Sequence, residues 1–337
     1  MITERVSVLM VTHQSAGTLG RALEAVGALD HGNLELVVVD CGSTDDSVAT
    51  ARRAWPSGME GELLELEENR GFTGGMNTGL AATEGPWILA LNPDAYPRPD
   101  FLSRLLDTAR GHPEVGAVTG RLLRSRREGE EELLDACGMY LVPTWRHLDR
   151  GSGRRDRGQL RRRCRVFGAT GAATLYRRRA LEDVALAGEI FDERFHSYRE
   201  DAELSFRLRE RGWEIVYEPG AVARHDRFNL PGRRSRMPPR VNFHSLKNRY
   251  LLRIYHQTVA NLLWTLPFTL FRDLLAFGWV LLRERSSLGA YGWVWRHRKE
   301  LFARRRRIQR RRRVSGGAID RWFFVSELAW TGGGADR

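Results

Sequence analysis

The feature of this sequence that most restricts its fold is the alternation of strand-like and helix-like segments over its first 120 residues. Short apolar runs rich in β-branched residues are separated by segments whose apolar residues recur at helical spacing. The predicted strands are residues 6–11, 34–39, 62–66, 87–91 and 115–119, and the predicted helices are residues 15–29, 43–55, 74–83 and 100–110. Alternation of this kind implies a mostly parallel sheet with helices on both faces. The predicted class is therefore α/β.

The alternation is interrupted after residue 120. Residues 121–165 are polar and rich in arginine, and we expect a hairpin within residues 133–142 and an irregular path elsewhere. Regular signals return with a predicted strand over residues 166–176 and a helix over residues 201–211. Gly212 follows this helix at the position where a left-handed cap residue is common, and a strand is predicted directly after it.

Charge is distributed unevenly along the 337 residues, which carry a formal net charge of +12. Residues 1–240 contain 35 Lys or Arg and 36 Asp or Glu, whereas residues 241–337 contain 19 and 6. A nucleic-acid partner is not expected, because the nearly neutral body offers no basic groove to match the basic tail. The three cysteines show no paired spacing, and the first apolar run is too short for a secretory signal. These features predict a cytoplasmic protein.

The basic tail is also rich in apolar and aromatic residues. Residues 259–282 contain many Leu, Phe and Trp, but Pro267 and the pair 272–273 interrupt them. The longest stretch without charge, residues 257–271, is shorter than the roughly 20 residues that span a bilayer. Eight arginines follow within residues 304–313. We expect a helical region that lies on an anionic membrane surface, with helix packing or a dimer interface as the alternative.

Polar clusters follow several of the predicted strands. Ligands of open α/β sheets bind at the carboxyl ends of the strands, where Thr12, the segment 40–43 and the segment 92–94 are expected. Residues 69–77 add glycines that allow a close approach of backbone to ligand, and they lead into a helix N-terminus that favours phosphate. Each cluster is common on its own, but their number and order are specific.

In this order the clusters resemble the inverting family-2 glycosyltransferases with a GT-A fold, and within them the rhamnosyltransferase-like branch. The resemblance covers roughly residues 5–230. It is carried by Val8-Leu9-Met10-Val11-Thr12, Val39-Asp40-x-x-Ser43-Thr44-Asp45, Asn69-x-Gly71-Phe72 through Asn77-x-Gly79, Leu91-Asn92-Pro93-Asp94, Glu200-Asp201 and His225. The sequence departs from the family pattern at Cys41, where Asn is usual, and at Glu203, where Asp is frequent.

The resemblance implies a role for each of these motifs. Thr12 and Asp40 would hold the base and ribose of a nucleotide-sugar donor. The further donor-binding candidates are Ser43, Asn69, Arg70, Gly71, Asn77 and Asn92. Asp94 stands at the position of the family's metal-binding motif, and Asp201 at that of the catalytic base, with Glu200 beside it as a second catalytic candidate.

The chemistry of these residue types agrees with such roles. A divalent cation can neutralise a diphosphate leaving group, and Asp94 and His225 could ligate Mn²⁺ or Mg²⁺ together with phosphate oxygens. One carboxylate acting as base, without a second nucleophile, favours inversion. Structural explanations stay open, because acids at a helix start such as Glu200 and Asp201 also cap the helix, and His225 could be an ordinary hydrogen-bonded histidine.

Taken together, the sequence predicts a metal-dependent, non-processive glycosyltransferase on the inner face of the plasma membrane. It would move one sugar, rhamnose from dTDP-rhamnose or a sugar from a UDP donor, to a lipid-linked or cell-envelope glycan. The expected parts are a GT-A domain over residues 1–235, with a nucleotide half (1–120) and an acceptor half (121–235), and a membrane-associating region over residues 240–337. The alternative is a catalytically silent GT-A scaffold that tethers glycan-synthesis enzymes to the membrane. Whether the chain forms a homo-oligomer is left open.

Overall fold

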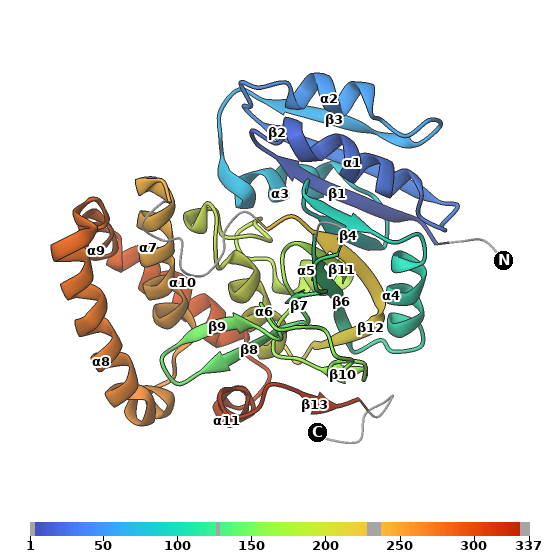
Figure 1. The fold of residues 1–337 in the computed structure, drawn as a ribbon. Coiled ribbons are helices and arrows are strands. Elements are labelled where there is room, and N and C mark those ends of the chain that lie inside the picture. The colour runs from blue at the N-terminus through green and yellow to red at the C-terminus, as the bar shows by residue number, and fades with distance from the viewer. Residues whose placement is uncertain (1–3, 126–128, 228–236, 331–337) are drawn as a thin grey trace.

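The computed structural model describes residues 4–125, 129–227 and 237–330, and its centre is a mixed sheet (Figure 1). The eleven described strands of this sheet are β1 (Val6–Thr12), β2 (Leu34–Cys41), β3 (Glu60–Leu66), β4 (Trp87–Leu91), β5 (Ala95–Pro97), β6 (Val115–Arg124), β7 (Leu134–Ala136), β10 (Cys164–Arg165), β11 (Ala173–Arg177), β12 (Glu214–His225) and β13 (Leu328–Ala329). Their order is β13-β10-β12-β6-β11-β4-β1-β2-β3, with β5 beside β12 and β7 beside β6.

The first half of the sheet is parallel, as the alternation predicts. Strands β4, β1, β2 and β3 all run in one direction, and Thr12 at the end of β1 lies opposite Asp40 in β2. Strands β1 and β4 are buried along their whole length, and β2 nearly so, which explains why they are almost continuous apolar runs. Strand β11 is antiparallel to both neighbours, so that the complete sheet is mixed.

Helices cover both faces of the sheet and form a separate core on each. One core lies between the sheet and helices α1 (Ala16–Gly27), α2 (Ser47–Arg53) and α4 (Phe101–Ala109). The other lies between the sheet and helices α3 (Gly71–Ala82), α5 (Arg178–Val184) and α6 (Glu200–Glu210). Gly212 follows α6 with a positive φ of 91°, as its predicted capping role requires. The predicted α/β class is therefore confirmed.

Two predicted strand segments are wrong in detail. Residues 134–136 pair with β6, and the hairpin lies further along the chain, between β8 (Met139–Val142) and β9 (Arg146–Asp149). The strand predicted over residues 166–176 is split into β10 and β11. Between these two strands the chain leaves the sheet to pack on α6, where a Cβ added at Gly168 would lie 2.7 Å from the Ser205 hydroxyl.

The C-terminal helices are α7 (Pro239–His256), α8 (Val259–Arg283), α9 (Gly289–Arg296), α10 (Arg298–Arg311) and α11 (Gly316–Asp320). They share a third apolar core with the body, in which Phe206 of α6 meets Tyr255 of α7 and Ile308 of α10. Strand β13 then pairs with β10 at the edge of the central sheet. The predicted boundary at residue 235 lies outside the described residues, and the division of the chain into residues 1–235 and 240–337 stays a prediction.

Half of the arginine run holds α10 against the body and against the end of α7. Arg304 forms an ion pair with Asp192 at 2.8 Å, and Arg305 and Arg311 donate to backbone carbonyl oxygens. Arg312 forms an ion pair with Glu210. Arg306, Arg307, Arg310 and Arg313 are exposed. The guanidinium groups of the first four are thus engaged by protein, and contact of the exposed arginines with an anionic membrane surface stays a prediction.

Helix α8 carries its polar side chains inward and its apolar side chains outward. Asn261, Thr265 and Thr269 are buried against the protein. The exposed large apolar residues of α8 are Val259, Leu262, Leu263, Leu266, Phe268, Leu270, Phe271, Leu274, Leu275, Phe277, Trp279, Leu281 and Leu282. This is the reverse of an ordinary surface helix. We call this set the outer face of α8, and Figure 1 shows the helix at the margin of the C-terminal cluster.

Helix α8 is also longer than the sequence suggested. It continues through Pro267 and residues 272–273, and Asp273 is neutralised by ion pairs with Arg249 and Arg253 of α7. By length and composition it is the one helix among the described residues that could cross a membrane, and 17% of its most apolar window is buried. The length limit drawn from residues 257–271 was therefore too strict.

Candidate active site

A pocket of about 440 Å³ brings together five of the predicted site residues. Asn92 and Asp94 reach it from the end of β4, Glu200 and Asp201 from the start of α6, and His225 from the end of β12. Its other lining residues are Phe72, Asp135, Arg146, His147, Asp149, Thr170, Gly171, Ala172, Ser197, Tyr198, Arg199, Arg227 and Ser245. Segments far apart in the sequence thus meet in one cleft at the strand ends.

One wall of the pocket is a chain of acidic and histidine side chains. Asp94 Oδ1 lies 3.3 Å from His225 Nε2, and Asp135 Oδ2 lies 2.7 Å from His225 Nδ1. Burial alone would lower the pKa of His225, but hydrogen bonds and charges from Asp135 and Asp94 outweigh it and raise the pKa to about 9. Asp94 Oδ1 is buried, and among the described residues it has no hydrogen-bond partner besides His225 Nε2. Asp135 therefore fixes the ring so that Nε2 faces Asp94.

The second candidate group in the pocket is the acid pair at the start of α6. Asp201 accepts hydrogen bonds from the backbone N–H of Gly171 at 3.1 Å and of Ala202 at 2.7 Å. Burial raises the pKa of both carboxyls; the charge of Asp201 adds to this rise for Glu200, and the charge of Asp149 adds to it for Asp201. A carboxylate with a raised pKa is a stronger base than an exposed one.

The backbone that leads into this acid pair is strained. His196, Tyr198 and Arg199 have positive φ angles of 62°, 71° and 71°, a region that residues other than glycine rarely adopt. Such conformations cost about 1–3 kcal/mol each and persist only where the surroundings hold them. The segment 195–199 must therefore be held by other parts of the fold.

Helix α7 holds the segment from one side. The side-chain amide of the fully buried Asn248 donates to the carbonyl oxygens of Phe195, Ser197 and Tyr198, at 2.9, 2.9 and 2.7 Å. Arg199 Nε donates to the carbonyl oxygen of Ser245 in α7 at 3.2 Å. The C-terminal region thus contributes directly to the position of the acid pair.

Helix α3 holds the segment from the other side. The backbone N–H of Thr73 donates to the carbonyl of His196 at 3.1 Å. Gly71 has a φ of 72°, and a Cβ added there would lie 2.4 Å from His196 Nδ1. Only glycine fits at this contact. The motif of residues 69–77 and the segment that leads into the acid pair are therefore linked by a hydrogen bond and by close packing.

Replacing Asn248 with aspartate tests the role of this clamp. The new carboxylate would face three carbonyl oxygens without a proton to donate, so we expect the segment 195–199 to shift. A displacement of about 1 Å at catalytic groups can cost about 100-fold in rate. We expect kcat to fall by about 10- to 100-fold, with little change in the KM for the donor, when initial rates are measured below the melting temperature. A variant with the kcat of the parent would show that the clamp is dispensable.

The remaining donor candidates lie at the ends of β1 and β2 and beside α3. Asp40 accepts hydrogen bonds from the backbone N–H and the hydroxyl of Ser43, at 2.8 and 2.6 Å. The hydroxyl of Thr12, the register partner of Asp40, is buried without a hydrogen-bond partner in the described part of the chain. Asn69 Oδ1 accepts from the backbone N–H of Gly71 at 2.8 Å. None of these residues lines the 440 Å³ pocket.

Two of the donor candidates are occupied by protein groups. The amide of Asn77 exchanges two hydrogen bonds with the backbone of Phe191, at 2.8 and 2.9 Å. Arg70 forms an ion pair with Glu193 at 2.9 Å. Both interactions tie α3 to the segment that precedes the acid pair, and this long-range contact has no counterpart in the local sequence.

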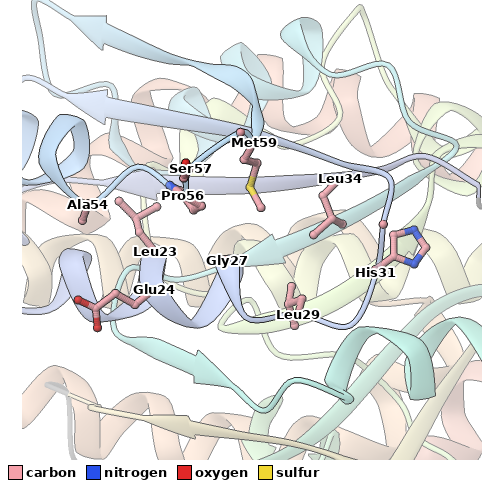
Figure 2. A pocket seen from close by; sticks show the side chains of 12 residues that line it. Leu23, Glu24, Gly27, Leu29, His31, Leu34, Ala54, Pro56, Ser57 and Met59 are labelled. Atoms are coloured by element: carbon pink, nitrogen blue, oxygen red, sulfur yellow. The ribbon is translucent and has the colours of Figure 1, made fainter.

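A second pocket, of about 540 Å³, lies elsewhere on the molecule (Figure 2). It is formed between the end of α1 and the turn after α2, where Leu23, Pro56 and Met59 contribute apolar surface. Glu24 and His31 are its titratable lining residues, and it includes none of the predicted site residues. The first pocket is therefore the candidate active site despite its smaller volume.

Comparison with known proteins assigns the family. The family model described as "Glycosyl transferase family 2" matches residues 7–185, which is more than half of the chain. The chain is a family 2 glycosyltransferase. This match ends before the acid pair and His225, so their roles rest on the geometry described above.

The glycosyltransferase has named relatives of similar sequence. It is 29% identical over 252 residues to the N-acetylglucosaminyl-diphospho-decaprenol L-rhamnosyltransferase of Mycobacterium tuberculosis, a match that covers 69% of this chain and 79% of the relative. It is 28% identical over 235 residues to an N-acetylglucosaminyltransferase of Azorhizobium caulinodans, covering 66% and 55%.

Solved structures confirm the fold of the glycosyltransferase. The mannosyltransferase of Pyrobaculum calidifontis, in complex with GDP-Man and Mn²⁺, matches with a TM-score of 0.54 at 18% identity, covering 96% of this chain and 88% of that chain. Staphylococcus aureus TarS 1–349, in complex with UDP-GlcNAc, matches with a TM-score of 0.54 at 15% identity, covering 95% and 89%. The predicted GT-A fold is thus confirmed.

Proposed function

We propose that this glycosyltransferase moves a single sugar from a nucleotide-sugar donor to a hydroxyl of a lipid-linked or cell-envelope saccharide, with inversion. The observation that carries the proposal is the half-buried acid pair in one pocket with the Asp94–His225 pair. A rhamnosyl donor, such as dTDP-rhamnose, is supported by the printed name of the mycobacterial relative, and a UDP-sugar is the alternative. The same name supports a lipid-linked acceptor.

In the proposed reaction Asp201 accepts the proton of the acceptor hydroxyl. The acceptor oxygen forms a bond to the anomeric carbon of the donor while the bond from that carbon to the phosphate oxygen breaks. The nucleoside diphosphate leaves with the electron pair, and the proton stays on Asp201. Attack from the side opposite the leaving group inverts the anomeric centre. Asp201 is the chosen base because its carboxylate is fixed by two backbone N–H groups and has a raised pKa.

The Asp94–His225 pair in the same pocket fits a divalent cation. Among the described residues no group of three His, Cys, Asp or Glu side chains could hold a metal by itself. Asp94 Oδ1 is buried with no hydrogen-bond partner there besides His225, and Asp135 orients His225 as carboxylates orient metal-binding histidines. We propose that Asp94 and His225 hold Mn²⁺ or Mg²⁺ together with the donor diphosphate. The cation would neutralise the charge of the leaving group.

A donor screen tests the proposed function. The purified full chain is incubated with a panel of sugar nucleotides and MnCl₂, and products are detected by mass spectrometry with membrane extract as acceptor. We expect one donor, dTDP-rhamnose first, to be transferred or slowly hydrolysed and to raise the melting temperature. If no nucleotide or nucleoside diphosphate stabilises the protein and none is consumed, the scaffold hypothesis replaces the proposal.

We further propose that the enzyme acts as a peripheral protein on the inner face of the plasma membrane, through the outer face of α8. The exposed apolar side chains would enter the headgroup boundary, and exposed arginines such as Arg283, Arg285 and Arg306 would face anionic lipid. Deletion of the tail is unsuitable as a test, because it would also remove α10 and β13 from the fold.

Substitutions on the outer face of α8 test this location. Leu263 and Leu274 are exposed, so glutamate at both should leave the fold intact while placing charge against lipid. We expect the parent to float with phosphatidylglycerol vesicles in a salt-sensitive manner. We expect the double variant to bind these vesicles at least about 10-fold more weakly. Ala49→Glu, on an exposed position of α2, is the matched control. If the parent does not bind vesicles but forms dimers through Leu263 and Leu274, the outer face of α8 is instead a protein interface.

A further inference from the structure

One wall of the active-site pocket has no role in the donor chemistry proposed above. Strand β9 contributes Arg146, His147 and Asp149 to the pocket that contains Asp201. With β8 it forms a separate two-stranded sheet within the predicted acceptor half, residues 121–235. Asp149 is paired with Arg227 at 2.6 Å. Arg146 and His147 are the other two side chains that β9 contributes to this wall, and no role has yet been proposed for them.

His147 offers an unused hydrogen-bonding atom. Its Nδ1 is buried and has no hydrogen-bond partner in the described residues. Burial, together with the charges of Arg199, Arg146 and Arg227, holds the pKa of His147 well below its ordinary value, so the ring is neutral. A buried polar atom without a partner costs free energy, which a ligand hydroxyl in the pocket would recover.

Arg146 offers an unused positive charge. It is exposed at the pocket and makes no ion pair within the part of the chain that the structure describes. By contrast, Arg227 is paired with Asp149 and Asp135, and Arg199 donates to a backbone carbonyl of α7. Arg146 is therefore the lining cation best able to bind a phosphate, for which a guanidinium group is well suited.

The preceding residue makes this wall rigid. Trp145 is buried, and its ring stacks on Phe206 of α6 with centroids 5.5 Å apart. Its indole N–H donates to Asn261 of α8 at 2.8 Å. One residue thus anchors the hairpin to the helix that carries Asp201 and to the helix proposed to meet lipid. Such anchoring preorganises the two neighbouring side chains.

We propose that Arg146 and His147 form the acceptor subsite, in which His147 hydrogen-bonds a hydroxyl of the acceptor sugar and Arg146 binds a phosphate attached to that sugar. This inference deepens the proposed function and rests on it. It narrows the acceptor class to saccharides linked to lipid through a phosphate or diphosphate.

The experiment compares two acceptors that differ only in their phosphates. One is N-acetylglucosaminyl diphosphate linked to a short alkyl chain, and the other is the neutral alkyl N-acetylglucosaminide. For Arg146→Ala we expect the KM for the diphosphate acceptor to rise about 10- to 100-fold, with little change for the neutral one. For His147→Ala we expect the KM to rise for both, with partial recovery in His147→Gln. The donor KM should stay within about twofold throughout.

Arg162→Ala is the matched control, because Arg162 is an exposed arginine of the same arginine-rich segment and lies outside the pocket. Equal effects of Arg146→Ala on both acceptors, or no effect, would overturn the phosphate contact. Unchanged acceptor KM in His147→Ala would overturn the hydroxyl contact.

Calorimetric binding of both acceptors, without donor, separates this inference from the proposed function. Binding of the diphosphate acceptor that depends on Arg146, without any transfer, would contradict the proposed function and keep the subsite. Transfer to the neutral acceptor alone, or binding of neither acceptor, would reject the subsite.

Discussion

Replacing Asp201 with asparagine is expected to reduce the rate of sugar transfer by about 10²- to 10⁴-fold, the usual contribution of a general base. The amide cannot accept the proton of the acceptor hydroxyl. Its oxygen can still accept the hydrogen bond from Gly171 or Ala202, so the start of α6 should stay in place. The measurement is kcat under saturating donor and acceptor, with circular dichroism and melting temperature as tests of folding. A folded variant that transfers sugar at the parent rate would exclude Asp201 as the base.

The pH dependence of the parent provides a second check on the same carboxyl. Asp201 acts as a base only when deprotonated, so the rate should fall as pH falls through its pKa. Because burial and Asp149 raise that pKa, the acid limb should lie at higher pH than for an ordinary aspartate. Asp149→Asn removes one cause of the rise, and we expect it to move the acid limb to lower pH. A limb that does not move would mean that another group controls it.

Replacing Asp94 with asparagine is expected to have an effect of similar size, through the donor instead of the acceptor. The variant loses one of the two proposed protein ligands, and with it the charge that attracts a divalent cation. We expect transfer to fall by about 100-fold or more, and the stabilisation of the protein by nucleoside diphosphate plus Mn²⁺ to disappear. The measurement is a thermal shift with and without MnCl₂, alongside initial rates.

Variants of Asp135 and Asp107 serve as comparisons for Asp94→Asn. Asp135→Asn leaves both proposed ligands present but removes the carboxylate that orients His225, so we expect the apparent affinity for Mn²⁺ to fall by about 10- to 100-fold. Asp107, an exposed acid of α4, is the control and should change neither rate nor affinity. Normal Mn²⁺ stabilisation in Asp94→Asn would rule out the proposed ligand.

Local patterns were sufficient to predict the first half of the fold. Strands β1, β2 and β4 are marked by their own apolar residues, and the polar residues after them, from Thr12 to Asp94, are fixed at one edge by parallel pairing alone. The GT-A prediction rests instead on the resemblance of the motifs to a known family, and the comparison with solved structures confirms it. Where a residue depends only on its neighbours in sequence, the sequence is informative.

Residues that depend on distant partners were missed. Asp135 and Asn248 have no distinctive motif, and their roles appear only when β7 meets β12 and α7 meets the segment before α6. Glu203, noted as a departure from the family pattern, is buried in an ion pair with Arg207 at 2.6 Å and does not line the pocket. The protein contacts of the arginine run, residues 304–313, were missed for a similar reason. A count of charges does not show which guanidinium groups form ion pairs with acids far away in the sequence.

Strand β13 has a consequence for how this protein is made. The sheet begins with Val6, yet β10 gains its outer neighbour only when residues 328–329 have been synthesised. A ribosome-bound chain that has reached His225 already contains every acid of the pocket, but it lacks Asn248 and the cover of that edge. Unpaired strand edges invite association with other chains. We therefore expect the nascent enzyme to remain inactive until α7 has left the ribosome, and the edge of β10 to stay open to association until β13 follows.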